Sequence, residues 1–149
     1  RDFCLSRGLG DVYKRQNLYL EDFEMLKFKS YVYKKMQVTP NGVAHIYVDK
    51  AMQRRFGLTT EQACEVVSFL SGIKGCIAWI AFIEMPDKTI RVRLRSRFMQ
   101  IHQLAEKYNG GGHEYTCGAT LYKREESELM IADADRMVGE YKANNSDWL

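Results

Sequence analysis

The sequence predicts a mixed α/β domain whose central sheet has about four to five strands, flanked by helices. Three observations indicate this fold class. Residues 76–84 are almost entirely apolar, as in a buried strand. Residues 90–96 alternate between apolar and basic side chains, as in a strand with one buried face. Residues 63–70 carry apolar side chains at helical spacing, so strand and helix patterns alternate along the chain.

The first part of the chain differs from the rest. Residues 1–16, RDFCLSRGLGDVYKRQ, have neither a helical nor a strand period and resemble a translated sequencing adapter. We therefore expect them to be a non-native leader and leave them out of the predicted fold. Residues 18–36 have an uneven helical pattern, and Thr-Pro-Asn-Gly at residues 39–42 predicts a turn.

The middle of the chain predicts two strands with helices between them. Residues 43–49 alternate as a strand, and residues 50–56 predict a short helix that ends at Gly57. The clearest helix spans residues 58–72, where Thr59 and Gln62 have the spacing of a capping box. Residues 76–84 then predict a central strand covered on both faces.

The last third of the chain predicts a hairpin, two helices and one more strand. Residues 86–88 form a turn, and residues 89–96 return as the hairpin partner of the central strand. Apolar residues from Phe98 to Tyr108 line a helix that stops at Asn109. A strand at residues 118–122 follows, and residues 130–141 lie on a final helix.

Composition limits the classes of function. Apolar residues make up 46% of the chain and charged residues 28%, and the net charge of +3 is too small to indicate nucleic-acid binding by itself. We see no apolar run long enough to span a membrane and no secretory signal, so we expect a cytoplasmic protein without a membrane partner. Cys4, Cys64, Cys76 and Cys117 form no C-x-x-C pair, so we expect reduced thiols and no zinc site.

The stretch IRVRLRSR, residues 90–97, places three arginines on one face of a strand. Arg91, Arg93 and Arg95 alternate with apolar residues and are roughly 6.6–6.8 Å apart along the strand. Such a row can bind phosphates through bidentate contacts. The alternative interpretation is a charged edge strand that discourages aggregation.

Three consecutive glycines, Gly110, Gly111 and Gly112, directly precede His113. One glycine is enough to end a helix, so the run indicates a backbone that something must approach closely. Glycine N–H groups can form an anion-binding nest, and a histidine ring can donate a hydrogen bond in either protonation state. The alternative is a helix end followed by an incidental histidine.

Other polar residues give no catalytic or metal-binding pattern. Asp133 and Asp135 are two residues apart on a predicted helix and do not face each other. His45 and His102 have no second ligand at a spacing typical of metal sites. We therefore expect neither a catalytic residue nor a metal site in this chain.

The segment LRSR…IHQLAEKYNGGGHEYTCGAT resembles the C-terminal, DHH-associated domain of the DHH phosphoesterase family. The shared pattern comprises Arg95-Ser96, the helix end Ala105-Glu106-Lys107-Tyr108, and Gly110-Gly111-Gly112-His113 followed by Gly118. Thr116 and Cys117 stand where the family usually has alanine, and both are small. Within the family, the segment is most similar to bifunctional oligoribonuclease and PAP phosphatase proteins.

The resemblance implies the substrate-binding half of a manganese-dependent phosphoesterase that hydrolyses short oligoribonucleotides and 3′-phosphoadenosine 5′-phosphate (pAp). The implied substrate-binding residues are Arg95, Ser96, Gly110, Gly111, Gly112 and His113. Catalysis and two manganese ions would belong to a missing N-terminal DHH domain, with residues 17–42 as the linker helix and residues 43–149 as the DHH-associated domain. The chain alone would then be inactive, and a homodimer is a possible assembly.

Two alternatives share parts of this pattern. Cyclic-dinucleotide phosphodiesterases also carry the Gly-Gly-Gly-His motif. The chain could therefore instead be the C-terminal domain of such a phosphodiesterase. A non-catalytic RNA-binding appendage, as in alanyl-tRNA synthetases, is the other, although the related loop there usually lacks a histidine equivalent to His113. RecJ-type exonucleases usually have two glycines before the histidine rather than three.

Overall fold

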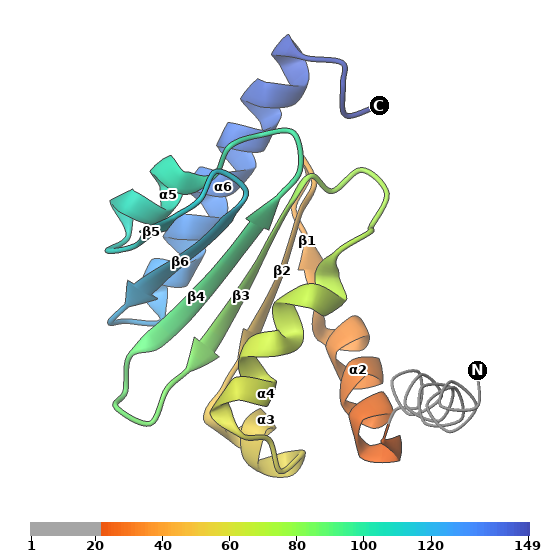
Figure 1. Cartoon of the computed structure of the whole chain (residues 1–149), viewed down its shortest axis with the longest axis vertical. Coiled ribbons are helices and arrows are strands. Elements are labelled where there is room, and N and C mark those ends of the chain that lie inside the picture. Colours follow the sequence, from red (N-terminus) through yellow and green to blue (C-terminus); the bar gives the residue numbers. More distant parts are fainter. Residues whose placement is uncertain (1–21) are drawn as a thin grey trace, which may run out of the picture.

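The structure, a computed structural model, describes residues 22–149. The predicted non-native leader, residues 1–16, lies outside the described residues, as does the start of the predicted linker helix, and both stay predictions. Residues 22–149 form a six-stranded sheet with helices on both faces (Figure 1). The predicted mixed α/β fold is therefore confirmed.

The sheet has the strand order β1-β2-β3-β4-β6-β5. The strands are β1 (Gln37–Val38), β2 (Val43–Val48), β3 (Ala78–Glu84), β4 (Ile90–Ser96), β5 (Gly111–Gly112) and β6 (Thr116–Leu121). β2 and β3 are parallel, and the helices between them supply the crossover that parallel strands need; every other neighbouring pair is antiparallel. Of the about four to five strands expected, the sequence locates four by residue; the two not located are β1 and β5, each of two residues, which is too short to give a sequence period.

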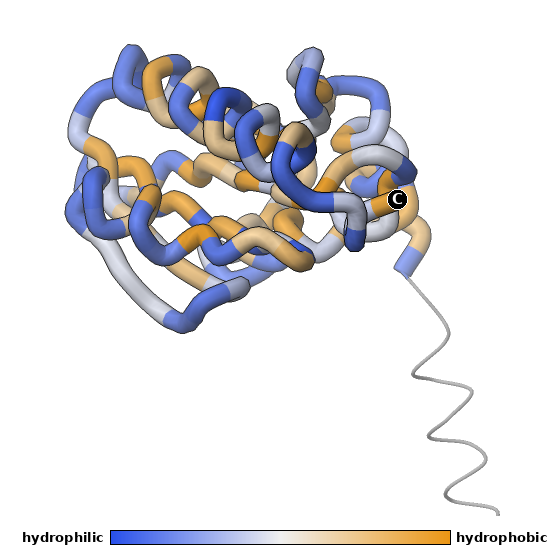
Figure 2. Tube along the Cα trace, turned by 90° about the horizontal axis from the view of Figure 1, so that it is seen from above, coloured by the Kyte–Doolittle hydropathy of each residue, from blue (hydrophilic) through white to orange (hydrophobic). Residues whose placement is uncertain are grey.

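Two groups of helices cover the two faces of the sheet. The helices are α2 (Phe23–Lys35), α3 (Lys50–Arg55), α4 (Thr60–Cys64), the 3-10 helix η1 (Glu65–Leu70), α5 (His102–Lys107) and α6 (Glu125–Asn144). One apolar core lies between the sheet and α5 and α6, and the other lies under α2, α3, α4 and η1. Figure 2 shows the hydrophobic segments concentrated in the strands between these helical layers.

The central strand is β3, as its uninterrupted apolar sequence predicts. Ile80 and Phe82 are buried in the core beneath α5 and α6, whereas Trp79 and Ala81 are buried in the core on the opposite face. A strand that packs on both faces needs apolar residues at every position, so it loses the alternation seen in β4.

The predicted helix at residues 58–72 is divided in two. Its capping box is present, because the Thr59 and Gln62 side chains bond each other's backbone N–H. The second half is the 3-10 helix η1 instead of α-helix. Two β-branched residues, Val66 and Val67, lower the helix propensity there, and the Ser68 hydroxyl donates to the Glu65 carbonyl at 2.8 Å.

The predicted helix at residues 98–108 is shorter than expected, and its assignment to Phe98 is wrong. Phe98 lies outside α5, with a positive φ of 68° and 43% of its surface exposed. The turn before α5 is held by the Ser96 hydroxyl, which donates to the Met99 carbonyl at 2.6 Å. The predicted stop at Asn109 is confirmed, since its φ of 62° ends the helix in the left-handed conformation.

The helices leave part of one sheet face open. The core under α2, α3, α4 and η1 contains residues of β2 and β3 and none of β4 or β6. In Figure 1 α3 and α4 lie on the viewer's side of the sheet toward β1 and β2, whereas β4 and β6 face the viewer uncovered. Within the described residues, no helix is both long and apolar enough to cross a bilayer.

Candidate functional site

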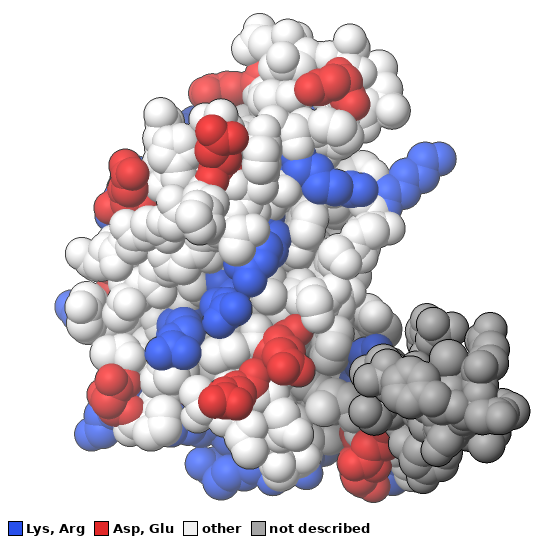
Figure 3. Space-filling view, viewed as in Figure 1, with Lys and Arg blue, Asp and Glu red and all other residues white. Residues whose placement is uncertain are grey.

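Three arginines occupy the open face of β4. Arg91, Arg93 and Arg95 alternate with apolar residues that are buried against α5 and α6. Figure 3 shows a row of basic side chains running over the open part of the sheet. β4 lies between β3 and β6, so the arginines do not protect an edge strand, which was the alternative interpretation of this pattern.

Within residues 22–149 the row forms no ion pair with a carboxylate, and Arg91 only helps to lower the pKa of the exposed Asp87. Among residues 22–149, no Asp or Glu oxygen lies within 4.0 Å of these guanidinium groups. Arg95 Nη1 donates to the carbonyls of Leu94 at 2.9 Å and Cys117 at 3.4 Å. Burial, followed by repulsion from Arg93, lowers the pKa of the Arg95 guanidinium. The arginines are close enough to repel one another, so a bound anion would relieve that repulsion.

The last two glycines of the run, Gly111 and Gly112, form the edge strand β5, and two glycines of the run are required by packing. A Cβ on Gly110 would lie 2.0 Å from the carbonyl oxygen of Gly118. A Cβ on Gly112 would lie 2.6 Å from the carbonyl oxygen of Thr116, and the φ of Gly112 is +144°. Both positions therefore need glycine so that β5 can pair closely with β6.

Two other glycines have no such steric reason. A Cβ on Gly111 would meet nothing within 4 Å, and one on Gly118 would meet only the Val92 carbonyl oxygen, at 3.5 Å. Neither glycine has a positive φ. Gly111 pairs with Gly118 across β5 and β6, and Gly118 pairs with Arg93 across β6 and β4. At this row, β5 and β6 therefore contribute no side chain to the described surface beside Arg93.

These features line one shallow groove of about 420 Å³. It is lined by Arg91, Val92, Arg93, Arg95, Asn109, Gly111, Gly112, Thr116, Cys117, Gly118, Ala119 and Thr120. Basic side chains form one wall, and the glycine backbone of β5 and β6 forms the floor beside them. Such a groove is suited to an extended anionic group that lies flat on the sheet.

His113 lies next to this groove rather than in it. It is exposed and lines an adjoining hollow of about 720 Å³ together with His102 and Tyr115. Thr116 links the two hollows, since it lines both and pairs with Arg95 across the sheet. The His113 N–H donates to the Thr116 carbonyl at 2.9 Å, so His113 and Arg95 both neighbour Thr116.

Cys117 fixes the turn that carries His113. Its thiol donates to the His113 carbonyl oxygen at 2.8 Å. Burial raises the pKa of Cys117, which keeps the thiol protonated and able to donate. Cys64, Cys76 and Cys117 are all buried and unpaired, as predicted for reduced thiols, while Cys4 lies outside the described residues.

Ser96 is separated from the arginine row. The residue is 6% exposed, and its hydroxyl is already bonded to the Met99 carbonyl. Its backbone N–H donates to the Tyr115 carbonyl at 3.1 Å, which ties the turn carrying His113 to the end of β4. The structure thus brings Arg95, Gly111 and Gly112 into one groove, with His113 adjoining, Gly110 packed against β6, and Ser96 beneath the turn.

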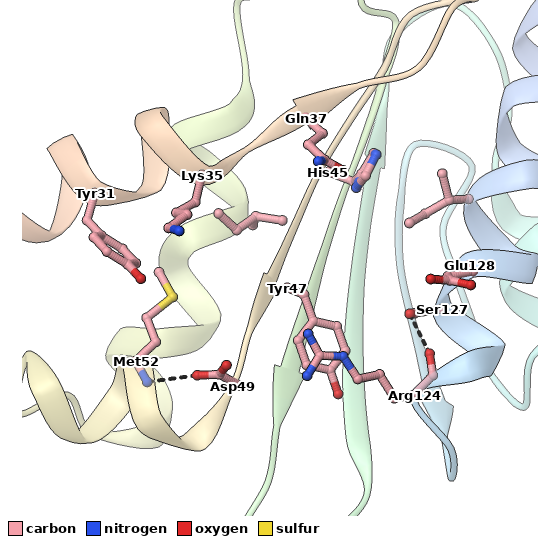
Figure 4. A pocket seen from close by; sticks show the side chains of 12 residues that line it. Tyr31, Lys35, Gln37, His45, Tyr47, Asp49, Met52, Arg124, Ser127 and Glu128 are labelled. Carbon is pink, nitrogen blue, oxygen red and sulfur yellow. Dashed lines mark hydrogen bonds between the residues drawn. The ribbon is translucent and has the colours of Figure 1, made fainter.

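A third hollow, of about 600 Å³, lies at the other side of the sheet against β2 (Figure 4). Its charges are mixed, because Lys35 and Arg124 share it with Asp49 and Glu128. The Arg124 guanidinium already lies 4.1 Å from the centre of the Tyr47 ring. This hollow is therefore less suited to a polyanion than the groove over β4.

The described residues do not fit a metal pair. Within residues 22–149, no three His, Cys, Asp or Glu side chains are grouped closely enough to hold a metal ion. Asp133 instead accepts hydrogen bonds from Tyr108 at 2.6 Å, Lys107 at 2.9 Å and Arg136 at 3.0 Å. This carboxylate fixes the end of α5, directly before the glycine run, to α6.

Comparison with known proteins identifies the family. The DHHA1 domain family matches residues 29–140, which is most of the chain. The chain belongs to the DHHA1 domain family. The predicted resemblance to DHH-associated domains is thereby confirmed.

The relatives of this DHHA1 domain include named enzymes. It is 34% identical over 125 residues to the bifunctional oligoribonuclease and PAP phosphatase NrnA of Bacillus subtilis, covering 84% of this chain and 40% of the relative. It is 34% identical over 113 residues to the NrnA of Mycoplasma genitalium, covering 76% of this chain and 35% of that protein. The chain thus spans about two fifths of the length of the relatives it matches.

Solved structures share the fold of this DHHA1 domain. An exopolyphosphatase-related protein from Bacteroides fragilis matches 93% of this chain and 41% of its own, with a TM-score of 0.72 and 25% identity. A pGpG-specific phosphodiesterase from Vibrio cholerae matches 87% of this chain and 43% of its own, with a TM-score of 0.59 and 16% identity. The similarity to the Vibrio cholerae protein shows a shared fold only.

Proposed function

We propose that this DHHA1 domain is the substrate-binding half of a phosphoesterase that hydrolyses short oligoribonucleotides and pAp. The observation that carries the proposal is the row of arginines, without an ion-pair partner among residues 22–149, beside a floor of glycine backbone. Arginine guanidinium groups match phosphate oxygens in a bidentate geometry. The NrnA relatives, which are named as oligoribonucleases and PAP phosphatases, support the choice of phosphate ligand.

Each implied site residue has a distinct role in this proposal. Arg95 binds a phosphate, and its contacts to two backbone carbonyls hold the guanidinium in place. His113 donates a hydrogen bond to the same ligand from the adjoining hollow. Gly111 leaves room for the ligand, while Gly110 and Gly112 let β5 pair with β6. Ser96 positions the turn of His113 through its backbone N–H.

Catalysis is assigned to another part of the protein. The described residues supply no metal cluster, so the manganese ions that the resemblance implies would be held by an N-terminal DHH domain of the same protein. A metal pair there would activate water for attack on phosphorus. The contribution of the present residues is to bind and orient the phosphate chain.

Calorimetric titration of the 149-residue chain with pAp tests the proposal. The expected result is saturable binding that is weakened at least tenfold by Arg95→Ala and by Gly111→Val. Arg54→Ala is the matched control, because Arg54 is an exposed arginine on α3 outside the groove. The proposal is contradicted if pAp does not bind, or if Arg95→Ala and Gly111→Val bind pAp as tightly as Arg54→Ala does.

A further inference from the structure

We propose that Arg91, Arg93 and Arg95 bind successive phosphates of one strand, so that the groove selects ligands with two or more phosphates one nucleotide apart. Arg93 is the central residue of this track and is a specificity-determining residue. The inference rests on the proposed function, because it assumes that the groove is a phosphate site. It adds the number and spacing of the phosphates that the site recognises.

The position of Arg93 relative to the glycines is the first argument. Gly111, Gly118 and Arg93 form one row across β5, β6 and β4. Glycine inside a strand weakens it and often marks close approach by a ligand. Packing demands glycine at neither Gly111 nor Gly118, whereas it does at Gly110 and Gly112. Gly111 and Gly118, which packing does not require to be glycine, are thus the two residues whose missing side chains leave the surface beside Arg93 open.

The bonding of Arg93 is the second argument. Arg95 is tethered to two carbonyls, and Arg91 Nη1 lies 3.9 Å from the Cys64 sulfur. Arg93 is half-buried, and among residues 22–149 it has neither a hydrogen-bond acceptor nor an ion-pair partner. A guanidinium has five donors, and those of Arg93 are therefore free to bind a phosphate in a bidentate geometry.

The spacing of the arginines is the third argument. Alternate residues on one strand face are about 6.6–6.8 Å apart, a separation of the order of that between successive phosphates in an extended strand. In pAp, the two phosphates are attached to the 3′ and 5′ oxygens of one nucleoside. One nucleotide of an RNA strand is flanked by phosphates in the same covalent arrangement. A pair of neighbouring arginines can therefore bind pAp and a short RNA by the same geometry.

A ladder of adenine nucleotides tests this inference on the 149-residue chain by calorimetry at one ionic strength. The ligands are AMP with one phosphate, pAp with two, and pApApA with three. Affinity is expected to rise from AMP to pAp. Arg93→Ala should lower the affinity for pAp about tenfold, or about 1.4 kcal/mol, and the affinity for AMP less than twofold. Arg91→Ala should weaken pApApA and leave AMP unchanged.

Two further variants show whether a loss of affinity is specific to the guanidinium group of Arg93. Arg93→Lys keeps the charge but loses the planar fork, so it should recover only part of the pAp affinity. Arg54→Ala removes one exposed arginine elsewhere and should change no ligand's affinity more than twofold. The inference is overturned if Arg93→Ala weakens AMP and pAp by the same factor, or if it behaves like Arg54→Ala. In either case, if Arg95→Ala still weakens pAp binding, the proposed function stands. If Arg95→Ala does not weaken pAp binding either, both the proposed function and this inference are contradicted.

Discussion

Arg93 on β4 and Gly111 on β5 lie in one row across the sheet, with Gly118 of β6 between them. This relationship joins the two sequence features that indicate phosphate binding, the arginine row and the glycine run. The two features are separated in sequence and become neighbours because β6 pairs with both β4 and β5. The row exposes a basic side chain beside backbone that no side chain of residues 22–149 covers.

The three glycines of β5 and β6 and the preceding Gly110 should respond differently to alanine. Gly110→Ala places a Cβ 2.0 Å from a backbone oxygen, and Gly112→Ala is strained at a φ of +144°. Each should lower the free energy of unfolding by about 1–3 kcal/mol, as overpacking and backbone strain do. Gly111→Ala and Gly118→Ala should instead raise it by about 0–1 kcal/mol, because alanine restricts the unfolded chain. Urea denaturation measures all four.

The same variants separate packing from binding. Gly111→Ala and Gly118→Ala should weaken pAp binding although they keep or raise stability. If all four variants are equally destabilised, or if Gly111→Ala binds pAp as well as the unsubstituted chain, the distinction between the two pairs of glycines is wrong.

Asp133 should stabilise the fold at neutral pH and cease to do so in acid. Burial opposes ionisation of this carboxyl, but hydrogen bonds from Tyr108, Lys107 and Arg136 outweigh it and lower its pKa below the ordinary value. Because the folded pKa is the lower one, the stabilisation is present above about pH 4 and is lost as the pH falls through the folded pKa. Asp133→Asn should cost about 1–3 kcal/mol at pH 7.

Thermal unfolding of the two proteins from pH 7 to pH 2 checks this dependence. The difference in melting temperature should shrink as the pH falls below about 4. Asp135→Asn offers a comparison on the same helix, since Asp135 bonds Asn41 instead of α5. A gap between Asp133→Asn and the unsubstituted chain that stays constant with pH would contradict the proposed electrostatic origin.

Alkaline pH should weaken the folded state through the buried thiols. Burial raises the pKa of both Cys76 and Cys117. A folded pKa above the unfolded one gives stability that is complete below the unfolded value and is lost as the pH rises through the folded value. The free energy of unfolding should therefore fall above about pH 9, and Cys117→Ala should reduce that slope. A slope unchanged in both Cys76→Ala and Cys117→Ala would show that other groups cause it.

The chain alone should not hydrolyse its ligand. Within the described residues no metal-binding cluster is present, so neither pAp nor a short oligoribonucleotide should be turned over with Mn²⁺. Release of inorganic phosphate from pAp, measured against a buffer blank containing the same Mn²⁺, checks this. Turnover by the purified chain that His113→Ala or Arg95→Ala abolishes would place catalysis in this domain and contradict the assignment.

The strands and helices with long periodic patterns could be predicted from sequence, and the short elements could not. β3 and β4 were predictable because apolar runs and strict alternation each have a direct cause in burial. β5 was not, since two glycines carry no side-chain period. The break between α4 and η1 depends on tertiary packing and on the Ser68 hydroxyl, neither of which a helical period reveals.

The candidate site was predictable in its chemistry and not in its arrangement. Alternation places Arg91, Arg93 and Arg95 on one face, but the family pattern directs attention to Arg95 alone. The importance of Arg93 comes from its register with Gly118 and Gly111, which depends on how β6 pairs with two strands. The sequence also does not reveal which glycines are required by packing, because that depends on which backbone atoms lie near each glycine in the fold.

The most direct test of the central claim is to map the pAp site by amide chemical shifts in a ¹⁵N-labelled 149-residue chain. The claim is that the groove over β4, β5 and β6 binds the phosphates. We predict saturable shifts of the Gly111 and Gly118 amides and of the Arg93 side-chain Nε–H, with no change at Tyr47 or Ser127 in the hollow against β2. Shifts confined to Tyr47 and Ser127, or no saturable shift at Gly111, Gly118 and Arg93, would contradict it.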